Sequence, residues 1–363
     1  MKFFQFYSSK STRRSLLSKP SLCGAWCFIV AASLVAAACG QRDPRFKVLP
    51  RNLGFLTNGL VNNKVDILWV IDNSGTMGPK QDNLRTSISS FMDQFEDKGM
   101  DYRIAVVTTD IRPVDPLNPN DPNLSGQAAC FVSSGANPKI VTPDTANGVQ
   151  VVGENADVGF FGSADAHGLD AVQLAFSEPN ISNCNSGFLR SDAFLAIIEF
   201  SDADDNTAAT VSALMSFLDT VKSPISTPNN GSVRGYFVSS MVVEDITRAE
   251  CVALGPFSEV GTKFLDIAAQ TGGAVASICD ADFSAGLLNV GEKILEATTA
   301  VILKDVPDVS TIVVTQNGNR VSNSATNGWT YEVDGNRVVF HGSAIPTSTT
   351  YVSIDYTPRD IVR

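Results

Sequence analysis

Segments that are apolar at nearly every position alternate, through the middle of this chain, with segments whose apolar residues recur at helical spacing. The segment "KVDILWVI", residues 64–71, is of the first kind, and residues 79–99 are of the second. Strands that are apolar throughout are buried on both faces, as in parallel sheets that helices cover on each side. The alternation continues to about residue 303 and predicts an α/β fold, a doubly wound and mainly parallel sheet flanked by helices.

The segments outside this pattern differ in composition. From Lys304 onward, apolar and polar residues alternate around two turn signals, Asn317-Gly318 and Asp334-Gly335, which predicts antiparallel hairpins. Residues from about 110 to 165 are dense in Pro, Asn, Asp and Gly. Residues 39–61 are mostly polar and show no regular spacing of apolar residues. We therefore expect a flexible tether over 39–61, an α/β domain over 62–303 with an insertion at about 110–165, and a C-terminal β module over 304–363.

The N-terminus carries five Lys or Arg residues and no acid, followed by an apolar run that ends in Ala-Ala-Ala-Cys. This pattern predicts a signal segment over residues 1–38, because the run is too short and lacks the basic flank of a membrane anchor. It resembles a bacterial lipoprotein signal peptide, which implies acylation of Cys39 and a lipid anchor in the cell envelope, at the outer membrane or cell surface. Ala36 stands where that class prefers Leu, so cleavage by an ordinary signal peptidase is the alternative.

The charge of the chain limits its partners. The formal net charge is −11, and removal of the five basic leader residues would leave 22 Lys and Arg against 38 Asp and Glu, close to −16. Binding to phosphate backbones needs a basic surface, so nucleic acid is excluded as a partner. Two histidines and no CxxC pair argue against a zinc site.

Four of the seven cysteines lie beyond the leader and Cys39: Cys130, Cys184, Cys251 and Cys279. An even number in an exported protein predicts two disulfides, for which three pairings exist. We expect Cys251–Cys279, because Cys251 precedes a helix and Cys279 ends the following strand, which places both at one edge of the sheet. Cys130–Cys184 then follows partly by elimination, and it would pin the insertion that these two cysteines flank.

Small oxygen-bearing side chains follow the first apolar strand in "VDILWVIDNSGTMG", residues 65–78. Asp72, Ser74 and Thr76 offer hard oxygen atoms, which suit Mg²⁺, Mn²⁺ or Ca²⁺. Asp202 follows the strand in "FLAIIEFSD", and the carboxyl ends of parallel strands meet at one edge of a sheet. These four residues therefore predict a divalent-metal site, although a serine or threonine in the turn could instead cap the following helix.

The stretch "DILWVIDNSGTM" resembles the first motif of a von Willebrand factor type A domain, whose metal-ion-dependent adhesion site begins with Asp-x-Ser-x-Ser. Thr76 stands at the last serine and keeps its hydroxyl, and Asp202 matches the later aspartate of the family. The resemblance covers about residues 62–303. Through "SDADD" and "TGGAVASICDADF" it extends to exported bacterial proteins of this family, many of them lipid-anchored and carrying a similar β tail.

The threonine that contacts the metal in this family has no clear counterpart here. The corresponding loop is "FGSADAHG", residues 161–168, in which Ser163 or Asp165 could substitute. An acid at this position would lower the residual positive charge of the cation and its attraction for a carboxylate.

The resemblance implies a non-enzymatic protein of the cell envelope that binds a protein partner. A divalent cation, Mg²⁺ first and Ca²⁺ or Mn²⁺ otherwise, would meet a carboxylate offered by that partner. One alternative is a structural envelope scaffold with a degenerate metal site. The other is a haloacid-dehalogenase-type phosphatase, in which Asp72 and Thr76 would fit but Ser74 cannot serve as the general acid. The chain has no Gly-x-Ser-x-Gly elbow or Walker loop either, so we expect no enzymatic activity.

Overall fold

The computed structural model describes residues 51–54, 61–118, 126–255 and 258–359. All of them belong to one structural unit, residues 48–363. The predicted signal segment, the acylated Cys39 and most of the predicted tether lie outside the described residues. Within the described ranges, no helix combines the length and the apolar character that crossing a bilayer requires.

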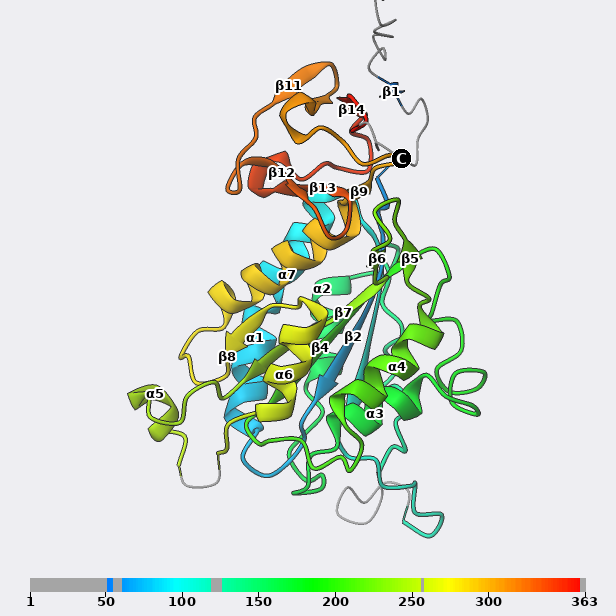
Figure 1. The fold of residues 1–363 in the computed structure, drawn as a ribbon. Coiled ribbons are helices and arrows are strands. Elements are labelled where there is room, and N and C mark those ends of the chain that lie inside the picture. Colours follow the sequence, from blue (N-terminus) through cyan, green and yellow to red (C-terminus); the bar gives the residue numbers. More distant parts are fainter. Residues whose placement is uncertain (1–50, 55–60, 119–125, 256–257, 360–363) are drawn as a thin grey trace, which may run out of the picture. The chain divides into compact units, whose positions relative to one another are not determined.

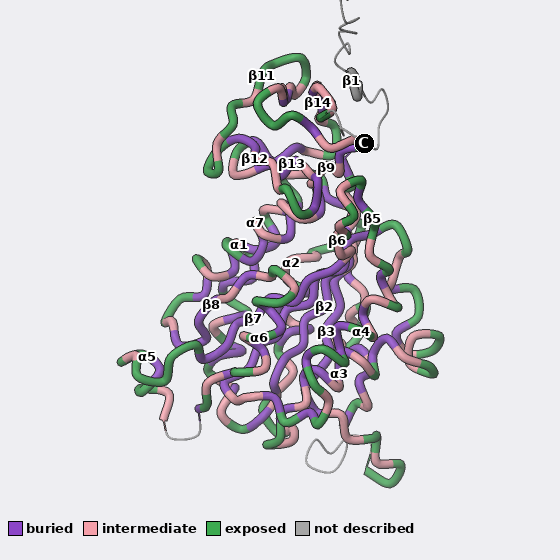
Figure 2. The backbone as a smooth tube through the Cα atoms, viewed as in Figure 1, coloured by how far each residue is buried: buried purple, intermediate pink, exposed green. Residues whose placement is uncertain are grey.

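A parallel five-stranded sheet lies at the centre of the structure, in the order β3-β2-β4-β7-β8 (Figure 1). Every residue of β4 and β7 is buried, and Figure 2 shows the burial of the central strands. The predicted α/β class is confirmed, since apolar strands of this kind require cover on both faces. The strands are β2 (Lys64–Ile71), β3 (Asp101–Thr108), β4 (Phe194–Ser201), β7 (Tyr236–Val242) and β8 (Val275–Ser277).

The strand order changes direction at β2, because β3 lies on one side of it and β4 on the other. In open α/β sheets, a crevice forms at the carboxyl ends of the strands where the order changes direction. The segments that follow β2 and β4 therefore meet at the place where such folds bind ligands.

Six helices cover the two faces of the sheet. One face packs against α1 (Gly78–Lys98), α2 (Gly148–Ala156) and α7 (Ser284–Thr299). The other packs against α3 (Gly168–Ala175), α4 (Val211–Val221) and α6 (Thr262–Thr271). The apolar residues that predicted α1 form its buried face, and the helix ends at Gly99, whose φ of 64° is the left-handed conformation that glycine adopts without strain.

Antiparallel strands follow the α/β part, as the alternating pattern predicted. One hairpin turns at Asn317-Gly318, between β10 (Val313–Gln316) and β11 (Asn319–Val321). The other joins β12 (Gly328–Glu332) to β13 (Arg337–His341), and β13 also pairs with β9 (Val301–Ile302). Two short 3₁₀ helices, η1 (Val309–Thr311) and η2 (Gly342–Ala344), complete this region.

Part of the predicted tether is a strand. β1 (Arg51–Gly54) pairs antiparallel with β14 (Val352–Tyr356), which also pairs with β10. The pairing partner lies about three hundred residues away along the chain, so no local period marks β1. The boundaries proposed for the domains remain predictions.

The insertion is more ordered than its loop-like composition predicted. It contains α2, and it makes isolated antiparallel bridges to β3 at Val106↔Val132 and Ile104↔Val141. These bridges cover the outer edge of β3, which would otherwise expose unpaired backbone groups. A short hairpin, β5 (Ile225–Ser226) with β6 (Ser232–Val233), and the one-turn helix α5 (Ala249–Val252) lie between the larger elements.

Both predicted disulfides form. Cys130 and Cys184 are joined with their Cα atoms 5.5 Å apart, and Cys251 and Cys279 with theirs 4.8 Å apart. Cys251 lies in α5 and Cys279 just after β8, at the carboxyl end of the sheet, as expected.

Candidate metal centre

The first residue of the turn between β2 and α1 continues the hydrogen bonding between β2 and β4. The backbone N–H of Asp72 donates to the carbonyl of Phe200 on β4 at 2.9 Å, which continues the pairing of the two strands by one residue. The carboxylate Oδ1 of Asp72 then accepts the backbone N–H of Ser74 at 2.8 Å. A carboxylate that bonds the backbone two residues on is a turn-forming arrangement, and it directs the next side chains toward β4.

Asp202 meets this turn from the end of β4. The hydroxyl of Thr76 donates to Oδ1 of Asp202 at 3.0 Å, and the hydroxyl oxygens of Ser74 and Thr76 lie 3.4 Å apart. The four residues predicted as ligands are therefore brought together at the carboxyl ends of two adjacent strands. Neither hydroxyl caps α1, whose N-cap is Met77 without a side-chain hydrogen bond, so the helix-cap interpretation is wrong.

The cluster is buried more deeply than a site on a surface edge would be. Asp72 and Asp202 are fully buried, Ser74 is 7% exposed, and Thr76 is half-buried. Burial raises the pKa of Asp72 above its ordinary value, and the negative charge of Asp202 adds to that rise. Hydrogen bonds from Ser201 and Ser74 to its carboxylate act in the opposite direction. A nearby cation would stabilise the ionised form of Asp72 and reverse the effect of burial.

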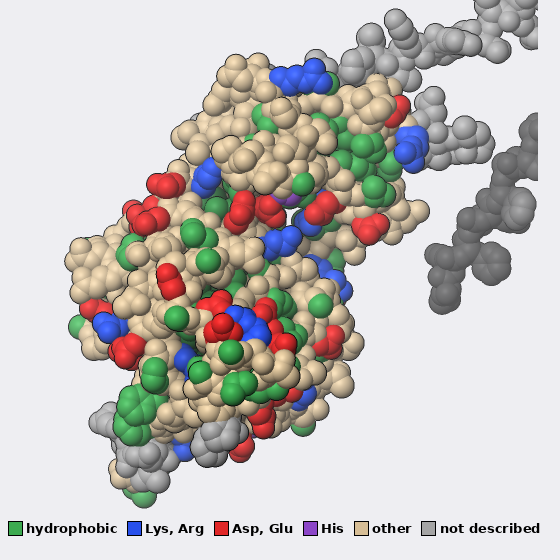
Figure 3. All heavy atoms as spheres, turned by 90° about the vertical axis from the view of Figure 1, so that its left-hand side faces the viewer, with side chains coloured by type: hydrophobic (Ala, Val, Ile, Leu, Met, Phe, Trp, Pro, Cys, Tyr) green, Lys and Arg blue, Asp and Glu red, His purple; other side chains and the backbone are tan. Residues whose placement is uncertain are grey.

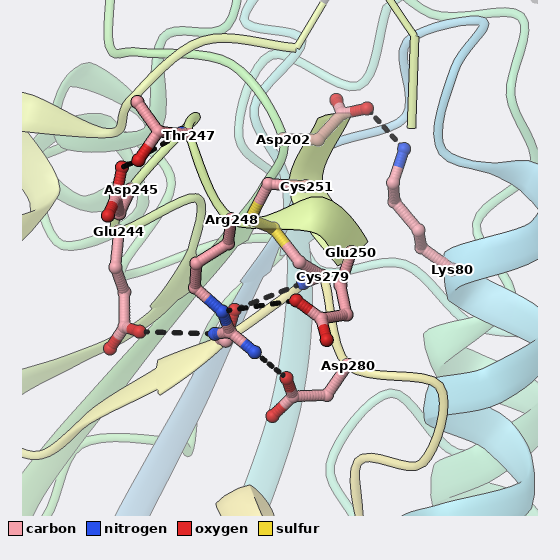
Figure 4. Close-up of a disulfide and its surroundings, with 11 residues drawn as sticks. Lys80, Asp202, Glu244, Asp245, Thr247, Arg248, Glu250, Cys251, Cys279 and Asp280 are labelled. Carbon is pink, nitrogen blue, oxygen red and sulfur yellow. Dashed lines mark hydrogen bonds and ion pairs between the residues drawn. A yellow bond between two sulfur atoms is a disulfide. The ribbon is translucent and has the colours of Figure 1, made fainter. Parts of the chain in front are cut away.

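Three further residues belong to the site and were not predicted. Ser201 Oγ donates to Asp72 Oδ2 at 2.6 Å, and Gln81 Nε2 donates to the carbonyl oxygens of Asp72 and Gly159 at 3.0 and 2.8 Å. Lys80, which is 7% exposed, contacts Asp202 Oδ2 with its ammonium group and donates to the Thr76 carbonyl at 3.0 Å. Figure 4 shows the Lys80 side chain pointing from α1 toward Asp202.

The sequence held a weak signal for Lys80. It lies four residues after Thr76 in the first turn of α1, and helical side chains point back toward the N-terminus of their helix. A long side chain at this position therefore reaches the turn from which the helix starts.

Ser163 and Asp165, the uncertain contributors, do not join the four ligands by any hydrogen bond within the described part of the chain. The backbone N–H of Ser163 donates to Asp110 Oδ2 at 3.3 Å, and Ser163 Oγ accepts the N–H of Asp165 at 3.1 Å. The side chain of Asp165 is exposed. Their loop nevertheless borders the site, because the N–H of Gly162 donates to the carbonyl of Asn73 at 2.8 Å.

The donor set suits a hard cation. It consists of two carboxylates and two hydroxyls, the oxygen ligands that Mg²⁺, Ca²⁺ and Mn²⁺ accept. Among the described residues, no group of three or more His, Cys, Asp and Glu side chains could hold a metal, so any site here depends on the hydroxyls. The Lys80 ammonium already lies against Asp202, and this stand-in cation shows that the cluster accommodates positive charge.

The solved structures named here are distant from this chain in sequence. No protein-family model and no curated protein matches the chain. Proximal thread matrix protein 1 from the mussel byssus superposes with a TM-score of 0.39 at 13% identity, over 68% of this chain and 51% of that one. A form of it with a zinc-occupied MIDAS motif gives 0.37 at 12% identity, over 67% and 50%.

The pilus adhesin SpaC from Lactobacillus rhamnosus GG gives a TM-score of 0.38 at 13% identity in its open conformation, over 81% of this chain and 38% of that one. The chain thus spans about half of the mussel protein and less of the adhesin. The parallel sheet with helices on both faces and small antiparallel sheets after it fits the von Willebrand factor type A-like α/β fold that the sequence predicted.

Proposed function

We propose that this protein is a divalent-metal-dependent binding module and not an enzyme. The observation that carries the proposal is the convergence of Asp72, Ser74, Thr76 and Asp202 at the carboxyl ends of β2 and β4. These four residues would hold the ion. A bound divalent ion would supply positive charge to which a carboxylate of a protein partner can bind.

The charge of the protein supports a cation as mediator. The chain carries 38 Asp and Glu against 27 Lys and Arg, and Figure 3 shows acidic side chains spread over one face with basic ones between them. Two acidic surfaces repel each other unless a cation lies between them. Mg²⁺ is the first candidate, with Ca²⁺ and Mn²⁺ as the others.

A role outside the cytosol is part of the proposal. Two disulfides are typical of proteins that fold in an oxidising compartment. With the basic, acid-free leader, they support an exported protein that is anchored by lipid on Cys39 at the outer membrane or cell surface. Mass spectrometry of the mature N-terminus tests the anchor, and an unmodified start at another residue would exclude it.

Phosphatase-type hydrolysis is less well supported. Ser74 stands where that chemistry needs a carboxylic acid, and its hydroxyl lies 3.4 Å from the hydroxyl of Thr76, with no histidine in this hydrogen-bonded group of described residues. The two histidines contact Asp170 and Glu296 instead.

Calorimetric titration of the purified protein with Mg²⁺ and Mn²⁺ tests the proposal. The wild-type protein should bind one ion, and Asp72→Ala should bind none while keeping its far-UV circular dichroism. Because Asp72 is buried, this variant is also expected to change the free energy of unfolding, which must be measured in parallel. If a folded Asp72→Ala variant bound the metal like the wild type, the structural-scaffold alternative would replace the binding module.

A further inference from the structure

The buried ion pair of Lys80 and Asp202 lies inside the candidate metal centre. Both oxygens of the Asp202 carboxylate are engaged, Oδ1 by the Thr76 hydroxyl at 3.0 Å and Oδ2 by the Lys80 ammonium. The ammonium also donates to the Thr76 carbonyl at 3.0 Å. Lys80 therefore holds the same carboxylate, and the same turn, that a metal ion would hold.

The Lys80 ammonium and a divalent metal ion could occupy this cluster together only at a high electrostatic free energy. Asp72 and Asp202 carry at most two negative charges, and Lys80 already supplies one positive charge in a buried environment. A divalent ion added beside the ammonium would leave an excess of positive charge where water does not screen it. The ion and the ammonium group are therefore competitors for Asp202.

The arrangement with Lys80 in place also leaves polar atoms unsatisfied. Asn73 Oδ1 and Gln81 Oε1 are buried beside the turn, and neither has a hydrogen-bond donor among the described residues. Buried acceptors in folded proteins are nearly always paired with protein or water. These two acceptors can therefore accept hydrogen bonds from water, including water molecules on a bound ion.

We propose that Lys80 is a resident cation that stabilises the metal-free site and that a divalent ion must displace from Asp202. This inference rests on the proposed function and concerns the regulation of the same site. The lysine keeps Asp202 neutralised while no metal is bound, and it lowers the apparent metal affinity by the free energy of its own displacement. The protein thereby exchanges one cation for another at the end of β4.

The first experiment compares wild type, Lys80→Met and Lys222→Met by calorimetric titration with Mg²⁺ and Mn²⁺. Lys222 is the matched control, because it is also a buried lysine, 6% exposed, but pairs with Asp66. Its ammonium donates to the carbonyl of Ala193, just before β4, and so lies at the other end of the sheet. Lys80→Met should bind metal about tenfold or more tightly than the wild type, since one repelling unit charge is removed. Lys222→Met should lower thermal stability and leave metal affinity unchanged.

The second experiment uses the wild-type protein and does not depend on the folding of a variant. Acetylation of the Lys80 amine with acetic anhydride, quantified by peptide mass spectrometry, reports whether its ammonium group is held on Asp202. The amine should be protected without metal and should react several times faster at saturating Mg²⁺. Lys222 should stay protected in both conditions.

The outcomes separate this inference from the proposed function. Equal metal affinity of wild type and Lys80→Met, or an amine that stays protected with metal bound, would overturn the exchange and leave the binding module standing. Metal binding by Lys80→Met but not by the wild type would support Lys80 as the resident cation and contradict metal dependence of the natural chain. If neither protein bound metal, both proposals would be wrong.

Discussion

Ser201 donates its hydroxyl to Oδ2 of Asp72 at 2.6 Å, and this bond joins the ends of β4 and β2 inside the candidate metal centre. The second carboxylate oxygen of Asp72 accepts the N–H of Ser74. Both bonds favour the ionised carboxylate against the effect of burial. The two bonds thus offset part of the rise in the pKa of Asp72 that burial causes, and they favour the ionised state that a cation needs.

Ser201→Ala should therefore weaken metal binding. Loss of this bond raises the pKa of Asp72 further, so that a proton competes better with the metal, and we expect roughly tenfold lower affinity for Mg²⁺ at neutral pH. The deficit should grow as the pH is lowered. Calorimetry at several pH values measures it, with Ser240→Ala as control, because Ser240 is a buried strand serine bonded to the Phe264 carbonyl. A pH-independent affinity equal to that of the wild type would contradict the role given to Ser201.

We expect the metal affinity to depend on the hydroxyl of Thr76 and not on its methyl group. Thr76→Val keeps the shape of the side chain but removes the oxygen and the hydrogen bond to Asp202, so metal affinity should fall by about tenfold or more. Thr76→Ser keeps the hydroxyl and should bind nearly as well as the wild type. Titration of both variants with Mn²⁺ distinguishes them, and equal affinities would remove Thr76 from the ligand set.

Glu199 predicts a pH-dependent change in stability. It is fully buried on β4, both of its carboxyl oxygens lack a hydrogen-bond partner in the described structure, and burial with the nearby Asp205 charge raises its pKa well above the ordinary value of 4.5. Below about pH 4.5 the Glu199 carboxyl is protonated in both the folded and the unfolded chain, so its burial as a charged group does not lower the free energy of unfolding. As the pH rises above it the unfolded chain ionises first, so stability is lost until the folded-state pKa is passed.

Glu199→Gln removes this penalty. The free energy of unfolding of the variant should exceed that of the wild type at neutral pH, and the difference should shrink as the pH falls below about 4.5. Urea unfolding at pH 7 and pH 4 measures it. Glu154→Gln is the control of opposite sign, because hydrogen bonds from Asn137 and Gln150 lower the pKa of Glu154. The same gain for Glu199→Gln at both pH values would point to packing instead of titration.

Asp66 holds a buried ion network near the amino ends of the strands. Its carboxylate accepts Nε and the backbone N–H of Arg190 at 2.8 Å each, and Lys222 lies 3.9 Å away. Asp66→Ala should lower the free energy of unfolding by about 3–5 kcal/mol, since it leaves buried positive charge without its partner. Asp192→Ala, which removes the exposed pair with Lys64, should barely change it. Chemical denaturation compares the two, and similar small effects would show that Arg190 and Lys222 find other partners.

The disulfide Cys251–Cys279 closes a loop with a sequence separation of 28. The double variant Cys251→Ser, Cys279→Ser should lose about 3–4 kcal/mol of stability, because the unfolded chain regains the freedom that the bridge removes. Its metal affinity should remain that of the wild type, as no hydrogen bond joins the bridge to the four ligands in the described residues. Thermal unfolding and Mg²⁺ titration test the two statements, and a parallel loss of metal binding would show that the bridge positions the site.

Some features of the fold and the site are encoded locally and could be predicted. The spacing of apolar residues predicts the strands and the amphipathic helices. The residues that follow parallel strands lie at the same edge of the sheet, and this prediction does not require the exact strand order. That is why the sequence could predict that Asp72, Ser74, Thr76 and Asp202 lie together and that Cys251 pairs with Cys279, with Cys130–Cys184 following partly by elimination. β1 was missed because a four-residue strand has no period of its own and exists through its pairing with β14.

The sequence by itself determined the α/β class, the chemistry of the ligand atoms and the positions of the turns, because these follow from side-chain type and spacing. The tertiary structure alone decided which charges face the site. Lys80 meets Asp202 across 122 residues and Ser201 meets Asp72 across 129. The position of Lys80 in the first turn of α1 is a weak local signal, but it does not say which carboxylate the lysine meets. Such pairs depend on strand order and register, and on the burial that makes a carboxylate require a partner. For the same reason the sequence left Ser163 and Asp165 as uncertain contributors, and in the described residues no hydrogen bond joins them to the four oxygen ligands.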